Sequence, residues 1–244
     1  MDVNEYRNIY LNENQHWWYK GLHELVELFI QKIKNNKDIK IFDAGCGTGK
    51  MLSILSKYGN VSGVDSSKLA INFSKQRGIK NVEVKDLNKW IPNEEVYDVL
   101  ISLDVLYHSQ IHDDLNIINK FYKTLKIEGV LILNLPALDI LKRSHDITVG
   151  GKRRYSKKKL KSELKKIGFQ KIRYTYRLPH LFFLIIIKKT FQKICFNKDA
   201  GSDLKPIHPI INRILFQLNR IENFFILKGF VFPIGSSVFM VAKK

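Results

Sequence analysis

The chain has 244 residues, of which 45% are hydrophobic and 26% are charged, and its formal net charge is +18. This composition excludes a chain too polar to bury a core, and it predicts one large domain or one domain with an added element. The two cysteines, Cys46 and Cys195, exclude a disulfide framework and a cysteine-rich metal site, so we expect no metal. The N-terminus has no basic segment followed by an apolar run, so we expect no signal peptide and a cytoplasmic location.

The positive charge is distributed unevenly along the chain. Residues 1–137 hold 17 Lys/Arg and 17 Asp/Glu, residues 138–198 hold 18 and 3, and residues 199–244 hold 6 and 3, for net charges of 0, +15 and +3. One segment therefore carries most of the charge, which favours an anionic partner there. A solvated basic face without a partner is the alternative interpretation.

Helical and strand-like patterns alternate along most of the chain, beginning with apolar residues at helical spacing over 17–34. The expected strands cover residues 39–45, 60–67, 80–86, 96–103, 129–136, 169–178 and 236–244. The further expected helices cover residues 49–59, 67–78, 112–126 and 156–168. Strands that alternate with helices at this spacing predict an α/β fold with a doubly wound, parallel sheet.

Residues 178–234 interrupt this alternation, because they are too many for a hairpin between the sixth and seventh strands. They hold two apolar and basic stretches, and we interpret them as a helical insertion. The expected organisation is an N-terminal helical cap over 1–37, a core over 38–177, the insertion over 178–234 and the last strand over 235–244. The aromatic cluster at 17–19, Trp-Trp-Tyr, fits a lid over a ligand or core packing equally well.

A glycine-rich loop follows the first expected strand, in the stretch IFDAGCGTGKM at 41–51. Gly45 and Gly47 fit a dinucleotide-binding loop, but Lys50 stands where the third glycine is needed. A triphosphate-binding loop needs a hydroxyl where Met51 stands, and the carboxylate of Asp43 would repel the phosphates. S-adenosylmethionine (SAM) fits better, because an acid suits its cationic part and a glycine loop before a helix suits its methionine carboxylate.

Two more acids follow the next two expected strands. Asp65 ends the second strand, where it could accept hydrogen bonds from both hydroxyls of a ribose, and Asp86 ends the third, where it could accept from an adenine amino group. Each acid alone also fits a helix cap. Together with Asp43 they would lie along the carboxyl edge of the sheet, where ligands bind in open α/β folds.

These stretches resemble the motifs of the Rossmann-like, SAM-dependent methyltransferases. FDAGCGTG (42–49), GVDSS (63–67), VKDLNKW (84–90) and YDVLISLDVLYH (97–108) resemble their first four motifs in order. LKIEGVLILNLP (125–136) resembles the segment that follows, with Ile127 and Glu128 in place of a usual Pro-Gly pair. HWWYK (16–20) and GGKRRYSKKKL (150–160) resemble a methyltransferase type 11 subgroup related to ubiquinone-type O-methyltransferases.

The resemblance covers about residues 38–175 and implies a seven-stranded, mainly parallel sheet whose last strand is antiparallel. It implies SAM as the cofactor. The cofactor-binding residues that it implies are Asp43, Gly45, Cys46, Gly47, Gly49, Asp65, Ser66, Asp86, Leu87 and Leu103.

Methyl transfer depends mostly on positioning, with a base where the acceptor must lose a proton. The fourth strand ends in SLDV and lacks the Asp-Pro-Pro-Tyr or Asn-Pro-Pro-Tyr of amino-methylating DNA and glutamine enzymes. His108 follows that strand and is the first candidate base, although it also fits a packing role, and His145 is the second candidate. Arg154 and Tyr155 are candidates for contact with the acceptor, the arginine through an anionic group.

The expected function is methyl transfer to a small-molecule or lipid-like acceptor, by positioning plus a histidine base in an O-methylation. The apolar run Leu181–Ile187 is too short to span a membrane, which needs roughly 20 residues. Basic and aromatic residues follow it, which favours peripheral contact with an anionic membrane surface, or a plain substrate cap. An RNA-directed methyltransferase and a catalytically inactive SAM-binding scaffold are the alternatives, and RNA ranks lower because the insertion is so apolar.

Overall fold

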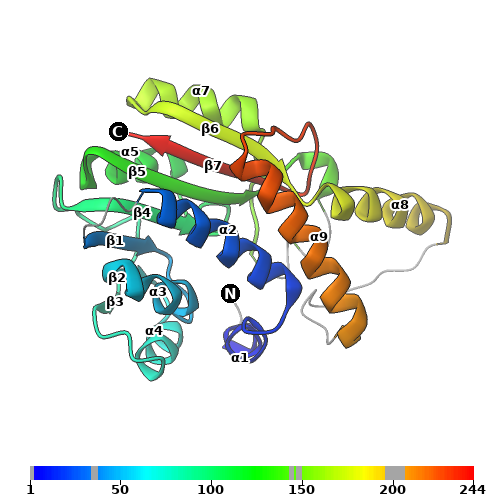
Figure 1. Ribbon diagram of the computed structural model, residues 1–244, viewed down its shortest axis with the longest axis horizontal. Coiled ribbons are helices and arrows are strands. Elements are labelled where there is room, and N and C mark those ends of the chain that lie inside the picture. Colours follow the sequence, from blue (N-terminus) through cyan, green and yellow to red (C-terminus); the bar gives the residue numbers. More distant parts are fainter. Residues whose placement is uncertain (1–2, 34–37, 143–145, 147–149, 196–206) are drawn as a thin grey trace.

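The computed structural model describes residues 3–33, 38–142, 146, 150–195 and 207–244. Within these ranges the chain forms one seven-stranded sheet with helices on both faces (Figure 1). The strands are β1 (Ile39–Ala44), β2 (Gly59–Asp65), β3 (Val82–Val84), β4 (Tyr97–Leu103), β5 (Leu125–Pro136), β6 (Gln170–Arg177) and β7 (Ser237–Lys243). The α-helices are α1 (Val3–Asn12), α2 (Trp17–Ile33), α3 (Lys50–Leu55), α4 (Lys68–Gln76), α5 (Asp114–Thr124), α7 (Lys157–Ile167), α8 (Pro179–Cys195) and α9 (Pro209–Leu227).

The strands lie in the order β3-β2-β1-β4-β5-β7-β6. Neighbouring strands from β3 to β5 pair in parallel, whereas β7 is antiparallel to both β5 and β6. The expected doubly wound sheet with an antiparallel last strand is therefore confirmed. The chain reverses its direction of winding between β1 and β4, and ligands of such sheets bind in the crevice outside the carboxyl ends of the strands at this point.

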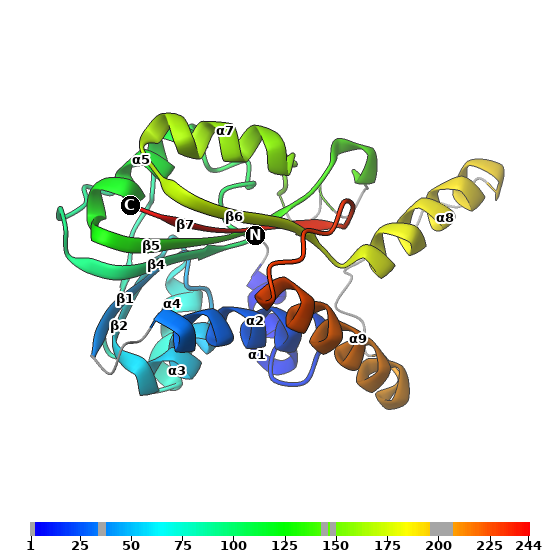
Figure 2. The same ribbon diagram turned by 45° about the horizontal axis from the view of Figure 1, so that its top comes forward.

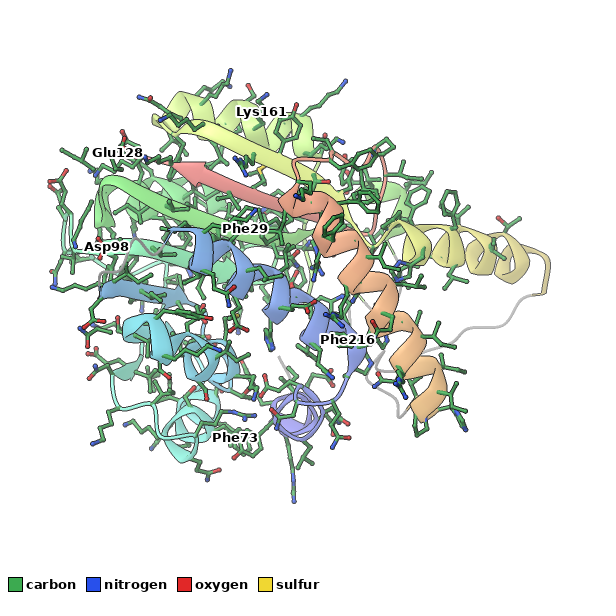
Figure 3. The ribbon with its side chains drawn as sticks, viewed as in Figure 1. Phe29, Phe73, Asp98, Glu128, Lys161 and Phe216 are labelled. Atoms are coloured by element: carbon green, nitrogen blue, oxygen red, sulfur yellow. The ribbon has the colours of Figure 1, made fainter. Side chains whose placement is uncertain are left out.

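The central strands are apolar on both sides because helices cover both faces of the sheet. Figure 2 shows α5 and α7 on one face and α1 to α4 and α9 on the other. One buried cluster joins β4 and β5 to α5 and α7, and a second joins α2 and α3 to the opposite face. In the second cluster the rings of Phe29 and Phe239 lie 5.5 Å apart between α2 and β7 (Figure 3).

Local signals place the helix ends close to the expected positions. The side chain of Ser67 accepts a hydrogen bond from the backbone of Ala70 at the start of α4, and Asp113 does the same for Asn116 at the start of α5. Three features differ from the expectation: α1 is an additional helix, β3 is shorter, and β5 begins at Leu125 directly after α5. Between β6 and β7 the described residues form the helices α8 and α9.

Candidate functional site

Four aspartates lie at the carboxyl ends of four neighbouring strands. Asp86 follows β3, Asp65 ends β2, Asp43 is the penultimate residue of β1, and Asp104 follows β4, in the order in which these strands lie in the sheet. All four line one cavity of about 890 Å³. The sequence predicts three of these acids at this edge. It missed Asp104, although Asp104 follows its strand just as the others do.

The glycine-rich loop makes room beside this cavity. Gly45 and Gly47 line it, with φ angles of 94° and 52°, a left-handed conformation that glycine adopts without strain. A Cβ atom on Gly45 would lie 2.2 Å from Val105, whereas one on Gly47 would meet nothing within 4 Å. Gly49 faces away from the cavity, where a Cβ atom would lie 2.5 Å from the hydroxyl of Ser74.

The environment of the Asp43 side chain suits a carboxylate that binds a cationic ligand. Its side chain is 3% exposed, and its Oδ1 has no hydrogen-bond partner among the described residues. Burial, followed by the nearby carboxylate of Asp65, raises the pKa of Asp43 to about 8. A buried acceptor without a donor is unfavourable. A cationic ligand would supply the donor and stabilise the carboxylate.

Asp65 is fixed at the end of β2 by three donors. Its Oδ2 accepts from the backbone N–H of Gly47 at 3.0 Å, and its Oδ1 accepts from the N–H of Ser67 at 2.9 Å and from the hydroxyl of Tyr6 at 3.4 Å. Burial raises the pKa of Asp65, although the backbone donors counteract it. Because each carboxylate oxygen can accept two hydrogen bonds, Asp65 retains capacity for a ligand hydroxyl.

Asp86 is more exposed, at the far end of the same row. It accepts from the backbone and side-chain nitrogens of Asn88 at 2.9 and 2.7 Å, which orients its carboxylate. The other predicted cofactor residues that line the cavity are Cys46, Ser66, Leu87 and Leu103. Burial raises the pKa of the Cys46 thiol, so this cysteine stays protonated.

Helix α1 covers this end of the cavity. The sequence predicted a helical cap over 1–37 but not this separate helix. Tyr6 lines the cavity, and Glu13, just after α1, accepts a hydrogen bond from the hydroxyl of Thr48 in the glycine-rich loop. Glu13 also forms an ion pair with Arg77 at 2.5 Å, with both side chains almost fully buried. Arg77 donates to the backbone oxygens of Thr48 and Tyr10 at 2.9 and 3.2 Å. The helix is therefore bonded directly to the loop.

The start of α2 forms a further wall. Trp17, Trp18 and Tyr19 all line the cavity, and Trp17 is also buried, so the cluster both packs and contributes to the site. His23 lines it too, and burial, with the nearby Lys50 as a smaller cause, lowers the pKa of His23 to about 3. His23 is therefore neutral at physiological pH.

A buried polar chain reaches Asp104 from three other elements. Its Oδ2 accepts from the side-chain amide of Asn134 in β5 at 2.8 Å, and Asn134 accepts from the guanidinium of Arg177 in β6 at 3.3 Å. Glu222 of α9 accepts from the backbone of Leu178 at 2.8 Å, and its charge acts on fully buried Arg177. Burial raises the pKa of Asp104 to about 7, although the Asn134 hydrogen bond and the Arg177 charge counteract it.

Of the two predicted histidines, His108 lies at this end and lines the cavity. Its backbone N–H donates to Val105 at 3.1 Å, and its ring lies 4.3 Å from that of Tyr107. Gly150 packs beside the ring of His108, because a Cβ atom on Gly150 would lie 3.7 Å from Nδ1 of His108. His145, the second candidate base, lies outside the described residues.

The two predicted acceptor contacts have other partners. Arg154 lines the cavity, but its guanidinium pairs with both carboxylate oxygens of Asp146, with a shortest distance of 2.7 Å, so its charge is already balanced. Tyr155 is buried, and its hydroxyl donates to Asp114 at 2.7 Å and lies 3.1 Å from the backbone oxygen of Leu106. The structure places Tyr155 in the core cluster beside α5 and does not bring it to the cavity.

The cavity is acidic although the chain as a whole is strongly basic. Among the described residues that line it, seven are acidic and three are Lys or Arg: Glu5, Glu13, Asp43, Asp65, Asp86, Asp104 and Asp146 against Lys50, Lys85 and Arg154. Its remaining wall includes the apolar side chains Leu22, Leu181, Ile185, Ile207 and Leu215. Among the residues that the structure describes, no cluster of His, Cys, Asp and Glu could hold a metal ion.

Comparison with known families identifies this arrangement. The profile of a family described as "Methyltransferase domain" matches residues 35–194, which is more than half of the chain. The chain is a class I SAM-dependent methyltransferase by family. The resemblance predicted from the glycine loop and the strand-end acids is therefore confirmed, and SAM is the cofactor of this family.

Curated relatives of this methyltransferase match only part of its length. The ubiquinone biosynthesis O-methyltransferase of Rickettsia prowazekii is 29% identical over 113 residues, which is 39% of this chain and 45% of that protein. Phosphoethanolamine N-methyltransferase 1 of Zea mays is 27% identical over 187 residues, which is 72% of this chain and 36% of that protein. The chain thus matches about half the length, or less, of these relatives.

Solved structures share the fold over most of the methyltransferase. A SAM-dependent methyltransferase from Archaeoglobus fulgidus superposes with a TM-score of 0.57 at 18% identity, covering 91% of this chain and 94% of that one. Phosphoethanolamine N-methyltransferase 2 of Haemonchus contortus, in complex with SAM, gives a TM-score of 0.57 at 19% identity over 89% of this chain and 52% of that one. At these identities the likeness shows the fold alone.

The residues of this methyltransferase fit SAM. The unpartnered oxygen of Asp43 suits the cationic methionine end, and the open space beside Gly47 lets a ligand approach the backbone. Asp65 has capacity for hydroxyl donors, and Asp86 lies farther along the same edge with Leu87 beside it. The order of these groups along the sheet matches the order of methionine, ribose and adenine in the cofactor.

Proposed function

We propose that this methyltransferase transfers a methyl group from SAM to a hydroxyl of a small-molecule acceptor with an apolar, lipid-like part. The observation that carries the proposal is that one cavity joins the strand-end acids to Asp104, His108 and an apolar wall. When bound, SAM supplies an activated methyl group on a sulfonium. The remaining task of the protein is to position the acceptor and to remove its proton.

We assign the donor end of the cavity from the geometry of the strand ends. Asp43 holds the cationic end of SAM, Asp65 accepts from the ribose hydroxyls, and Asp86 accepts from the adenine amino group. The backbone of Gly45 and Gly47 approaches the ligand because neither residue has a side chain there. Cys46, Ser66, Leu87 and Leu103 complete the wall.

At the acceptor end, His108 removes the proton and Asp104 orients the acceptor by accepting a hydrogen bond from it. Asp104 lies directly after β4 and His108 lies in the loop that follows, at the switch point of the sheet. The pKa of Asp104, about 7, means that a large fraction of this side chain is ionised at neutral pH. Arg154 does not bind an anion in this proposal, because Asp146 already neutralises it.

The acidic lining bears on the class of acceptor. A phosphate or carboxylate next to the reacting atom would be repelled by the carboxylate of Asp104, whereas a neutral hydroxyl would not. The apolar wall suits a ring or chain attached to that hydroxyl. The Rickettsia relative is named a ubiquinone biosynthesis O-methyltransferase, which supports an acceptor of this kind.

An amine is the second candidate acceptor, and the same acidic lining favours it. A protonated amine would be attracted by Asp104, and it would lose its proton to His108 before transfer. The maize relative is named an N-methyltransferase. The two candidates differ in the atom that carries the new methyl group.

A matched pair of acceptors tests the proposal. Purified protein is incubated with SAM that carries a labelled methyl group and with either an alkylphenol or an alkylamine of equal chain length. We expect label on the phenol oxygen, and the Asp43→Asn variant gives the background. Label on the amine alone would replace O-methylation by N-methylation. A second incubation uses a lysate of the source organism in place of the two acceptors. A lipid-like acceptor would be contradicted if neither the phenol nor the amine carried label and the organic phase of the lysate also contained no label.

A further inference from the structure

Helix α9 buries three polar side chains and exposes a stripe of apolar ones. Asn219, Glu222 and Asn223 are buried against α2, where the amide of Asn219 donates to the backbone of Trp17 at 3.2 Å and that of Asn223 donates to Gly21 at 2.9 Å. The opposite side carries a stripe of apolar residues at intervals of three and four. Its members are 41–57% exposed: Ile211, Ile214, Leu218, Ile221 and Phe225. An ordinary surface helix instead turns its apolar stripe to the core.

Helix α8 carries a second group of exposed apolar residues. Phe183, Leu184 and Ile187 are 52–55% exposed. Helix α8 begins, and α9 ends, near the same end of the sheet, and the two helices extend from it in different directions (Figures 1 and 2). Exposed apolar residues gathered on neighbouring elements of a folded protein mark a site of interaction.

The inner sides of the same two helices line the cavity. Leu181 and Ile185 of α8 and Leu215 of α9 are among its lining residues, with Ile207 just before α9. The helices that carry the exposed apolar residues therefore also supply an apolar wall of the cavity that holds Asp104 and His108. Such a wall favours an apolar acceptor over water.

The charge of these helices is complementary to an anionic surface. Helices α8 and α9 contain five cations, Lys188, Lys189, Lys193, Arg213 and Arg220, and one acid, Glu222. Glu222 is buried on the α2 side, so no acid of the two helices faces outward. Arg213 is exposed beside the apolar stripe of α9, whereas Arg220 is exposed but paired with Glu24 of α2 at 3.1 Å. The side chains of Lys188, Lys189 and Lys193 lie outside the described residues, so these three cations are known from the sequence alone.

We propose that the outer faces of α8 and α9 dock on an anionic lipid bilayer, and that the acceptor passes from the bilayer into the cavity between them. Among the described residues no helix is long and apolar enough to span a membrane, so both would lie in its interface. The docking stands on the exposed residues alone. The lateral route rests on the proposed function, because it assumes an acceptor that resides in the bilayer.

Flotation with lipid vesicles tests the docking without SAM or turnover. We expect binding to vesicles of phosphatidylcholine with phosphatidylglycerol and weaker binding to phosphatidylcholine alone. The variant Ile214→Ser with Ile221→Ser should weaken binding by about ten-fold for each side chain removed. The control Ile91→Ser with Ile127→Ser removes two residues that are even more exposed, 86% and 75%, and should bind as the unchanged protein does. Ile127 neighbours Glu128, which lies at the opposite end of the molecule (Figure 3).

Arg213→Gln tests the charge separately. It should weaken binding to the anionic vesicles by about five-fold and leave binding to neutral vesicles unchanged. Equal binding of the unchanged protein to both kinds of vesicle would overturn the electrostatic part. Absence of vesicle binding would overturn the docking proposal. The exposed residues would then serve another partner, either a second copy of the chain that packs on Ile214 and Ile221 or an RNA that binds with a steep salt dependence.

Two acceptors that differ only in chain length test the lateral route. The Ile214→Ser, Ile221→Ser variant should lose turnover of a long-chain acceptor held in vesicles and keep turnover of a short-chain analogue in solution. Equal loss on both acceptors, or equal retention, would overturn the route. Absence of turnover on both acceptors by the unchanged protein, with vesicle binding intact, would instead count against the proposed function.

Discussion

The two ends of the cavity are built in different ways. At the donor end, Asp43, Asp65 and Asp86 each take their position from the strand that they end, and the three strands follow one another along the chain. At the acceptor end, Asp104 depends on Asn134 of the neighbouring strand β5, 30 residues along the chain, and through it on Arg177 of β6, a further 43 residues along. The difference teaches that binding of the common cofactor is encoded locally, whereas selection of the acceptor depends on long-range packing. Variants at the two ends should therefore affect different measured quantities.

The largest expected effect is on the chemical step. His108→Gln should lower kcat by about 10²- to 10⁴-fold, because it removes the proposed base while preserving the size of the side chain. The affinity for SAM, measured by calorimetry, should stay the same because His108 belongs to the acceptor end. Near-normal turnover of His108→Gln would remove this histidine from the mechanism.

The largest effect on cofactor binding should come from Asp43→Asn. Removing the partner of a buried cation costs about 3–5 kcal/mol, so the SAM dissociation constant should rise by at least about a hundred-fold. Asp98→Asn is a matched control, since Asp98 pairs with Lys126 near the amino end of β4, away from the cavity (Figure 3). If the two variants bound SAM equally well, Asp43 would not be the cation partner.

Asp104→Asn should lower kcat by about a hundred-fold, because the acceptor is no longer oriented. The pKa of about 7 also predicts that kcat/KM rises as the pH rises through 7, since the ionised carboxylate is the form that accepts the hydrogen bond. The variant should lose this rise while its SAM affinity is unchanged. A pH profile identical to that of the unchanged protein would assign the ionisation to another group.

SAM affinity itself should depend on pH. In the free protein Asp43 has a pKa of about 8, so below pH 8 it is protonated and must release its proton to pair with a cation. The dissociation constant should therefore fall about ten-fold for each unit of rising pH up to about 8, and it should be constant above. Calorimetry in buffers with different ionisation enthalpies counts the released proton. Asp43→Asn should bind weakly with no such slope.

The smallest expected effect concerns the contact between α2 and α9. A Cβ atom on Gly21 would lie 2.2 Å from the amide of Asn219, so Gly21→Ala should destabilise the fold by about 1–3 kcal/mol and lower Tm by several degrees. Adding Asn219→Ala removes the obstruction, and the double variant should be more stable than the sum of the single effects predicts. Additive effects would show that the helices already tolerate the extra methyl group.

The contrast between the two ends also explains what the sequence could predict. The sheet, the glycine-rich loop and three of the four strand-end acids were accessible, because each is specified by a short pattern of apolar residues and turns. Asp104 carried the same signal, an acid directly after a buried strand, and the rule that found Asp43 would have found it. The length of β5 was underestimated because Leu125 and Lys126 fit the end of the preceding helical pattern, so that Gly129 was expected to begin the strand.

What the sequence could not predict depends on partners far along the chain. Tyr155 and Arg154 were predicted as acceptor contacts, and no local pattern showed that their side chains pair with Asp114 and Asp146. Helix α1 lacks a strong apolar period and is held by the polar contacts of Glu13, so its position could not be read from a pattern. The sequence predicted a helical insertion over 178–234 but not the orientation of α9, because the side that packs on α2 is decided by asparagines that reach backbone oxygens.

The attachment of α1 has a consequence for the catalytic cycle. Tyr6 contacts Asp65, and Glu13 holds the glycine-rich loop, so a spent nucleoside that left past α1 would have to break these bonds. Each release by this route would include one undocking of a ten-residue helix. When that step is slower than methyl transfer, isotopic substitution of the methyl hydrogens leaves the steady-state rate unchanged and alters only the first turnover. The throughput of the enzyme would then be set by the hydrogen bonds of its N-terminus.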